Sequence, residues 1–176
     1  MTDALAWMEQ SAPSIFMRED FYAYFVALIL HAWGMAMLVG GGIAVSLRVL
    51  GVAQQTRLAK WRALFPIMRL GAVLALLSGL ALLAGYPAKA LTNWVFGLKF
   101  ACLLGAAWLV MNMARVSFSK GIEPVGLVKM QAMLALLLWL GAVGAGKLLL
   151  YTNKMLLTTD GQFEALALVG WLGWNL

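Results

Sequence analysis

The sequence predicts an all-α integral membrane protein, an up-down-up-down bundle of four helices that forms one domain over residues 1–176. Three observations predict it. Hydrophobic residues make up 64% of the chain and charged residues only 11%, whereas soluble domains carry about 25% charged residues. Four apolar segments each reach or exceed the roughly 20 residues that cross about 30 Å of hydrocarbon. Mostly short connections favour antiparallel packing of consecutive helices.

The predicted spans are 21–50, 64–86, 94–113 and 128–151. Before the first span, Thr2 and Asp3 are suited to cap a short interfacial helix that runs to Glu9. No basic segment precedes an apolar run at the N-terminus, so we expect the first span itself to act as the targeting signal.

Glycine and proline mark the ends of the later spans. Gly85-Tyr86-Pro87 is a turn signal after the second span, and Gly121 with Pro124 separates the third span from the fourth. Residues 163–176 are too short to cross a bilayer and contain two tryptophans. This segment is predicted to be an interfacial or partner-facing tail, because indole rings favour the headgroup region.

The distribution of charge predicts the orientation, because basic residues are retained on the cytoplasmic side. Eight basic residues flank the first and third connections: Arg48, Arg57, Lys60, Arg62, Arg69, Arg115, Lys120 and Lys129. The other side has Arg18, Lys89 and Lys154 together with six of the seven acidic residues. We therefore expect both termini on the periplasmic side of a bacterial inner membrane. Topology and lipid contact explain the net charge of +6, so no nucleic-acid partner is expected.

Three ionisable side chains lie well inside the predicted spans: His31, Lys99 and Lys147. Such residues cost roughly 2.5–3.5 kcal/mol at the bilayer centre and mark functional sites by default. All three fall in the outer half of the membrane, His31 about 15 Å below the start of the first span. Because they belong to three different helices, they are candidates to converge on one cavity. Tyr22, Tyr24 and Tyr151 would then lie near its mouth.

A b-type heme would account for all three residues. Neutral imidazole ligates heme iron, and lysines near the interface can pair with the propionate carboxylates. The sequence thus predicts His31 as the metal ligand, with Lys99 and Lys147 at the propionates. Because His31 is the only histidine, two histidines of one subunit cannot both ligate the iron. Two alternatives stay open: the lysines snorkel outward along their alkyl stems, or His31 forms a hydrogen bond between helices.

The eleven methionines carry a second metal hypothesis, since thioether sulfur is a soft ligand suited to Cu(I). Five of them fall in the predicted inner half: Met68, Met111, Met113, Met130 and Met133. Methionine is also a flexible filler of irregular apolar gaps, which is the simpler interpretation. Cys102 is the one cysteine, so it has no partner for an intramolecular disulfide.

Short motifs in the first three spans resemble those of a known group of proteins. They are Leu30-His31-x-x-Gly34, the glycines at 40–42, Leu47-Arg48-Val49-Leu50-Gly51, Leu77-Ser78-Gly79, and Trp94 followed by Lys99. The chain from residue 22 to 112 resembles small bacterial four-helix membrane proteins that include copper-resistance D-like domains and HemJ-type protoporphyrinogen oxidases. The resemblance implies that His31 and Lys99 take part in heme binding and activity. The further histidines of the HemJ type are absent here.

These observations favour a heme-binding membrane protein in electron transfer, or a subunit of a membrane redox complex. A cofactor-free structural or assembly subunit and a copper-handling protein are the alternatives. No acidic residue lies in a predicted span to orient His31, so a Ser/His/Asp arrangement is not indicated and no catalytic residue is named. The expected partners are the lipid bilayer and either other membrane subunits or further copies of the chain.

Overall fold

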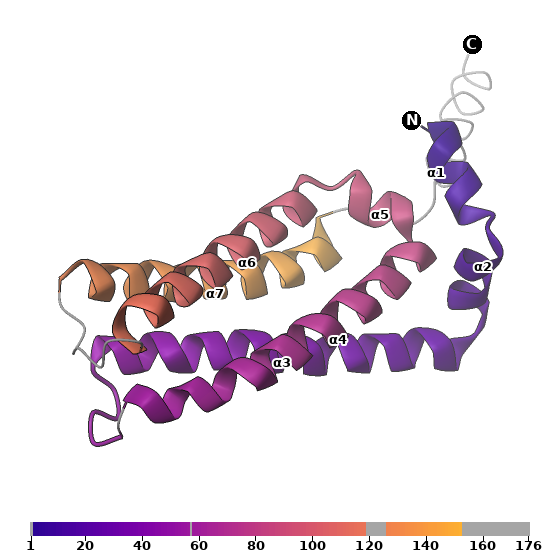
Figure 1. Ribbon diagram of the computed structural model, residues 1–176. Coiled ribbons are helices and arrows are strands. Elements are labelled where there is room, and N and C mark those ends of the chain that lie inside the picture. The colour runs from indigo at the N-terminus through magenta and orange to yellow at the C-terminus, as the bar shows by residue number, and fades with distance from the viewer. Residues whose placement is uncertain (1, 57, 119–125, 153–176) are drawn as a thin grey trace, which may run out of the picture.

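The computed structural model describes residues 2–56, 58–118 and 126–152, and within these ranges every regular element is helical (Figure 1). Four described helices are long and apolar enough to cross a membrane. They are α3 (Phe21–Leu50), α4 (Leu64–Gly85), α6 (Trp94–Met113) and α7 (Leu127–Tyr151). The prediction of a helical chain with four such helices is confirmed, and the predicted bounds differ by at most one residue. The predicted tail at 163–176 lies outside the described residues.

The shorter elements lie between or before the long helices. They are α1 (Thr2–Glu9), α2 (Ala12–Glu19), the 3-10 segment η1 (Leu58–Ala63), α5 (Pro87–Leu91) and the π-type segment η2 (Ala114–Phe118). The sequence predicted the first of these helices but only a turn where α5 lies. Pro87 occupies the first turn of α5, where proline is tolerated because its missing N–H has no helical partner.

Local capping fixes where the long helices begin and end. The Asp20 carboxylate accepts a hydrogen bond from the Ala23 backbone N–H at 2.8 Å, which starts α3. The Asn93 side chain accepts from the Val95 N–H at 3.0 Å, which starts α6. Gly51 ends α3 in the left-handed conformation with φ 114°, which glycine adopts without steric cost. These polar groups satisfy backbone atoms that a helix end leaves without partners.

The long helices are arranged as two close pairs. Successive helices run in opposite directions, α3 packs along α4, α6 packs along α7, and α3 also contacts α7 (Figure 1). In the described part of the chain α4 and α6 do not pack closely on each other. The two helix pairs are therefore joined by packing of α3 on α7, whereas α4 and α6 are packed more loosely.

Glycine lets α3 and α4 approach backbone to backbone. A methyl group added to Gly34 would lie 2.8 Å from the Gly71 carbonyl oxygen, and one added to Gly71 would lie 2.7 Å from the Gly34 carbonyl oxygen. Any larger side chain at either position would force the helices apart. Small residues at such crossings are typical of membrane helices, where dispersion contacts replace the hydrophobic driving force.

The apolar core is centred on Trp139 of α7, whose side chain is fully buried. Its indole ring lies against Gly42 of α3, where it occupies the space that a side chain would need. Val45, Val110 and Met113 pack in the same cluster. This core fills the half of the bundle in which α3 and α6 end and α4 and α7 begin.

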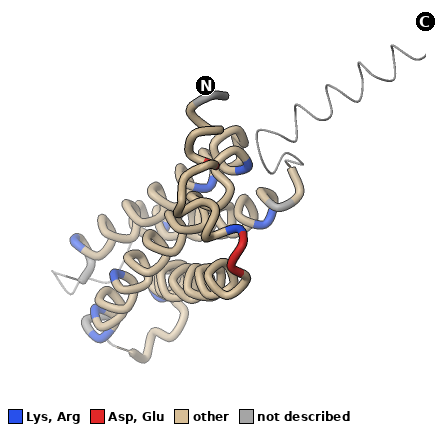
Figure 2. The backbone as a smooth tube through the Cα atoms, turned by 90° about the vertical axis from the view of Figure 1, so that its right-hand side faces the viewer, with Lys and Arg blue, Asp and Glu red and all other residues tan. Residues whose placement is uncertain are grey.

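Charged residues are divided between the two ends of the bundle. Figure 2 shows lysine and arginine at both ends of the bundle, with a group of them where α3 and α6 end and α4 and α7 begin. This group consists of Arg48, Lys60, Arg62, Arg69, Arg115 and Lys129. The acidic Glu19 and Asp20 lie at the opposite end, at the start of α3 (Figure 2). The middle of each long helix instead presents large apolar side chains outward.

Candidate functional site

A cavity of about 570 Å³ lies between α3, α4, α5 and α6, and Leu149 of α7 also lines it. It extends from the end of the bundle that carries α5 to Leu38 of α3, which belongs to the same core cluster as Trp139. Its volume falls within the roughly 300–1,000 Å³ typical of small-molecule and cofactor sites. Most of its lining is aliphatic or aromatic, and the side chains with polar atoms are Tyr24, His31, Tyr86, Lys89 and Lys99.

The cavity opens sideways between α4 and α6. Leu76 and Leu80 of α4 and Phe100 and Leu104 of α6 line the cavity and are also exposed on the outside of the bundle. The two helices are not closely packed on each other here, and both are long and apolar enough to cross a membrane.

His31 is the central polar residue, and α4 fixes the orientation of its ring. Nδ1 donates a hydrogen bond to the Ala75 carbonyl oxygen at 3.0 Å, because a carbonyl oxygen can only accept. The Ser78 hydroxyl donates to the Leu74 carbonyl at 2.6 Å, so its oxygen is left to accept from the same Nδ1 at 3.3 Å. In the neutral ring the proton therefore lies on Nδ1, and the lone pair of Nε2 points away from α4.

Lys99 of α6 approaches the other side of this ring. Its Nζ lies 3.4 Å from Nε2 of His31, and its side chain is partly buried. Its Cε would lie 3.8 Å from a methyl group added to Gly146 of α7, so α7 also adjoins the lysine. His31 thus contacts α4 through one nitrogen and α6 through the other.

The structure brings two of the three predicted ligand-site residues together. His31 and Lys99 both line the cavity, whereas Lys147 is exposed on α7 and is not among the lining residues. Of the three tyrosines expected at the mouth, Tyr24 lines the cavity. Tyr22 and Tyr151 do not, and their side chains are 77% and 79% exposed.

Sequence reasoning missed three residues of the site. Ser78 and Gly79 lie beside the imidazole, and a methyl group added to Gly79 would lie 3.1 Å from Cε1 of His31. Lys89 reaches the cavity from α5, a helix that the turn signal did not predict. Ser78 and Gly79 are part of Leu77-Ser78-Gly79, one of the short motifs that resemble those of the known group, so the sequence did point to these two residues.

The methionines do not gather at this site. Met35 lines the cavity, while Met68 and Met113 are buried in the Trp139 core. Met111, Met130 and Met133 are between 47% and 64% exposed. Among the described residues there is also no group of three or more His, Cys, Asp or Glu placed to hold a metal ion. This division between core and surface is typical of methionine as a packing residue.

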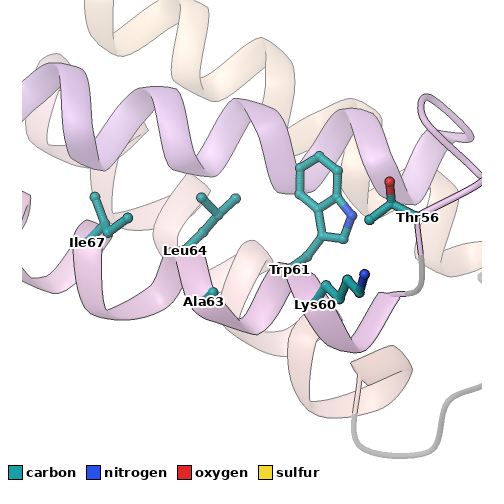
Figure 3. Close-up of a pocket in the computed structure, with 6 residues that line it drawn as sticks. All are labelled: Thr56, Lys60, Trp61, Ala63, Leu64 and Ile67. Atoms are coloured by element: carbon teal, nitrogen blue, oxygen red, sulfur yellow. The ribbon is translucent and has the colours of Figure 1, made fainter.

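A second, smaller hollow of about 230 Å³ lies at the opposite end of the bundle, beside η1 and the start of α4. Figure 3 shows its lining, in which Lys60 and Trp61 lie next to Thr56 of the connection after α3. The hollow is broadly open, and the residues that line it include no histidine, cysteine or carboxylate. The cavity at His31 is therefore the candidate site.

Comparisons with known proteins do not place the chain in a family. No protein-family model, curated protein or solved structure matches it. The interpretation of the site thus depends on its own chemistry: an oriented imidazole lone pair, two lysines and aromatic rings in an apolar cavity.

Proposed function

We propose that this protein binds a b-type heme in the cavity between α3, α4 and α6, and serves in electron transfer or as a subunit of a membrane redox complex. The orientation of His31 is the observation that carries the proposal. Its Nδ1 donates to the Ala75 carbonyl, so the lone pair of Nε2 faces the cavity, where it contacts the Lys99 ammonium at 3.4 Å and would bind iron once that ammonium turns aside. Histidines that ligate metals almost always donate their other ring N–H to a carbonyl, carboxylate or water, which fixes the tautomer and raises the basicity of the ligand.

The cavity fits such a group in its chemistry. Its lining is mostly apolar and includes the rings of Phe96 and Phe100, whose centroids are 4.9 Å apart. Lys99, whose Nζ lies 3.4 Å from Nε2 of His31, would turn its flexible side chain away from that atom to pair with a propionate carboxylate. Such a charge-assisted hydrogen bond is of the stronger kind. A bound heme supplies one-electron chemistry, while the chain's own residues hold the ring, orient the ligand and exclude water.

The two-end distribution of charge supports an orientation. The basic end carries Arg48, Arg62 and Arg69, whereas the other end carries Glu19 and Asp20 beside the basic Arg18 and Lys89. By the positive-inside rule the basic end is cytoplasmic, so the cavity lies in the outer half of the membrane. In a bacterial inner membrane this places the proposed heme near the periplasmic side, with the N-terminus on the same side.

Absorption spectra of the detergent-purified protein test the proposal. The protein is expressed with added heme precursor, and spectra are recorded oxidised and after reduction with dithionite. We expect a Soret band with reduced α and β bands in the wild type and in Lys147→Met, and the loss of these bands in a folded His31→Ala variant. A folded, heme-supplied wild type without a Soret band would overturn the proposal.

One observation favours a second candidate function, that of a cofactor-free structural subunit. The His31 ring contacts α4 at Ala75 and α6 at Lys99, so it also serves as a polar bridge between three helices. Such a bridge would stabilise the bundle without any ligand. In that case His31→Ala would lower the resistance to unfolding of protein prepared without heme, and wild-type protein would show no heme spectrum.

A further inference from the structure

The described lining of the cavity at His31 contains basic side chains from α5 and α6. Lys89 and Lys99 both line it, and no aspartate or glutamate is among its described lining residues. The sequence places no acidic residue anywhere in α3, α4, α6 or α7. Taking an ammonium group out of water is costly unless an anion pairs with it. The cavity is therefore suited to a ligand that carries negative charge.

Lys89 is held at the α5 end of the cavity by a rigid local structure. Its neighbours Ala88 and Ala90 are buried, and Pro87 restrains the first turn of α5. The Thr92 hydroxyl donates to the Ala88 carbonyl at 2.6 Å and closes this short helix. The Cα of Lys89 is thus fixed, and its flexible stem can carry the ammonium along the cavity wall.

The same end of the cavity has aromatic walls. Tyr24 of α3 and Tyr86, which directly precedes α5, meet edge to face with ring centroids 5.9 Å apart. Phe96 and Phe100 contribute rings from α6. Aromatic side chains favour contact with a flat, conjugated ligand. An apolar ligand can reach them from the bilayer through the opening between Leu76, Leu80 and Leu104.

We infer that Lys89 is a ligand-binding residue that holds a carboxylate of a flat, apolar tetrapyrrole acid at the α5 end of the cavity. This inference rests on the proposed function, because it takes the cavity to be the tetrapyrrole site. The sequence predicted that Lys147 pairs with a propionate carboxylate, but Lys147 is not among the residues that line the cavity. The inference assigns that role to Lys89. Two acid groups of one ligand then meet Lys89 and Lys99.

Binding of metal-free mesoporphyrin IX and of its dimethyl ester tests the inference without any iron–histidine bond. The affinities of both probes are measured by tryptophan fluorescence quenching with the full-length protein in detergent micelles. The variants are Lys89→Met, Lys89→Arg and the control Lys60→Met, in which the lost charge lies at the opposite end of the bundle. Circular dichroism establishes that each variant is folded.

We expect the wild type and Lys60→Met to bind the diacid about tenfold or more tightly than the ester, as a charge-assisted contact implies. Lys89→Met should lose most of that preference by weakening diacid binding, and Lys89→Arg should retain it. Equal affinities of the wild type for the two probes, an unchanged preference in Lys89→Met, or no binding of either probe would overturn the inference. This result is distinguishable from failure of the proposed heme ligation. That failure would show as the absence of a Soret band that depends on His31, whereas the metal-free probes bind without any bond between iron and His31.

Discussion

The carbonyl oxygen of Ala75 on α4 accepts a hydrogen bond from Nδ1 of His31 on α3, at 3.0 Å. This carbonyl points along the helix toward Gly79, four residues later, where no side chain blocks the approach of the ring. A methyl group at Gly79 would lie 3.3 Å from Nδ1. One glycine and one carbonyl thus decide which nitrogen of His31 faces the cavity.

Replacement of Gly79 by alanine should disturb the proposed heme site without unfolding the helix. The new methyl group presses on the imidazole at Cε1 and Nδ1, so the ring loses its geometry toward Ala75. We expect heme affinity to fall by about 10–100-fold, as for other changes that misplace a metal-ligating histidine. Gly97→Ala is the matched control, because nothing lies within 4 Å of its added methyl group. Titration of the heme-free variants with hemin measures both affinities, and equal values would contradict the expectation.

The two lysines predicted from the sequence should behave differently. Lys99 lines the cavity and Lys147 is exposed outside it. We expect Lys99→Met to weaken heme binding by about tenfold or more, through loss of a charge-assisted contact. Lys147→Met should bind heme as the wild type does. Hemin titrations in which Lys147→Met shows the larger loss would restore the original sequence-based assignment.

Gly42 should be intolerant of any side chain, because Trp139 fills the space beside it. Gly42→Ala is expected to lower the free energy of unfolding by about 1–3 kcal/mol through overpacking. Gly40→Ala is the matched control two residues away, since nothing lies within 4 Å of its added methyl group. Unfolding in mixed micelles with increasing SDS fraction measures both. The expectation is wrong if Gly42→Ala is as stable as Gly40→Ala.

Arg18 should hold the N-terminal helices against the end of α4. Its guanidinium donates to the Glu9 carbonyl at 2.7 Å, to the Ser14 hydroxyl at 2.6 Å and to the Gly85 carbonyl at 3.3 Å. Arg18→Ala removes all three contacts, so we expect faster proteolytic cleavage within residues 2–20 and no change in the long helices. Arg69→Ala, which removes an exposed arginine, is the control. Limited proteolysis with mass spectrometry gives the rates, and equal cleavage in both variants would rule out this role.

Apolar run length was enough to predict the four long helices. Each run reaches or exceeds the roughly 20 residues that a bilayer requires, and capping residues such as Asn93 and glycines such as Gly51 mark the ends locally. The sequence could not predict α5, because its five residues, Pro87–Leu91, are too few to show a helical periodicity. That helix is held by burial of Ala88 and Ala90, which is a tertiary contact.

The candidate site was predictable only in part. Cost in the membrane singled out His31 and Lys99, and both line the cavity. Lys147 avoids this cost, because its exposed side chain can extend to the membrane interface. The sequence gives the depth of a residue but not the rotation of its helix, so it could not show that Lys147 faces away from the cavity. Lys89 lies in α5, outside the predicted spans, so the cost of placing a charge in the bilayer did not identify it as a candidate.

The most direct test of the proposed function is rescue of His31→Ala by free imidazole. The variant is purified, mixed with hemin, and its Soret band is recorded as imidazole is added, with Ser46→Ala, a buried substitution in the same helix, as the control background. If Nε2 of His31 is the axial ligand, the variant alone lacks the wild-type spectrum and imidazole restores it in a saturable manner. A folded His31→Ala variant that keeps the wild-type heme spectrum without imidazole would contradict the proposal.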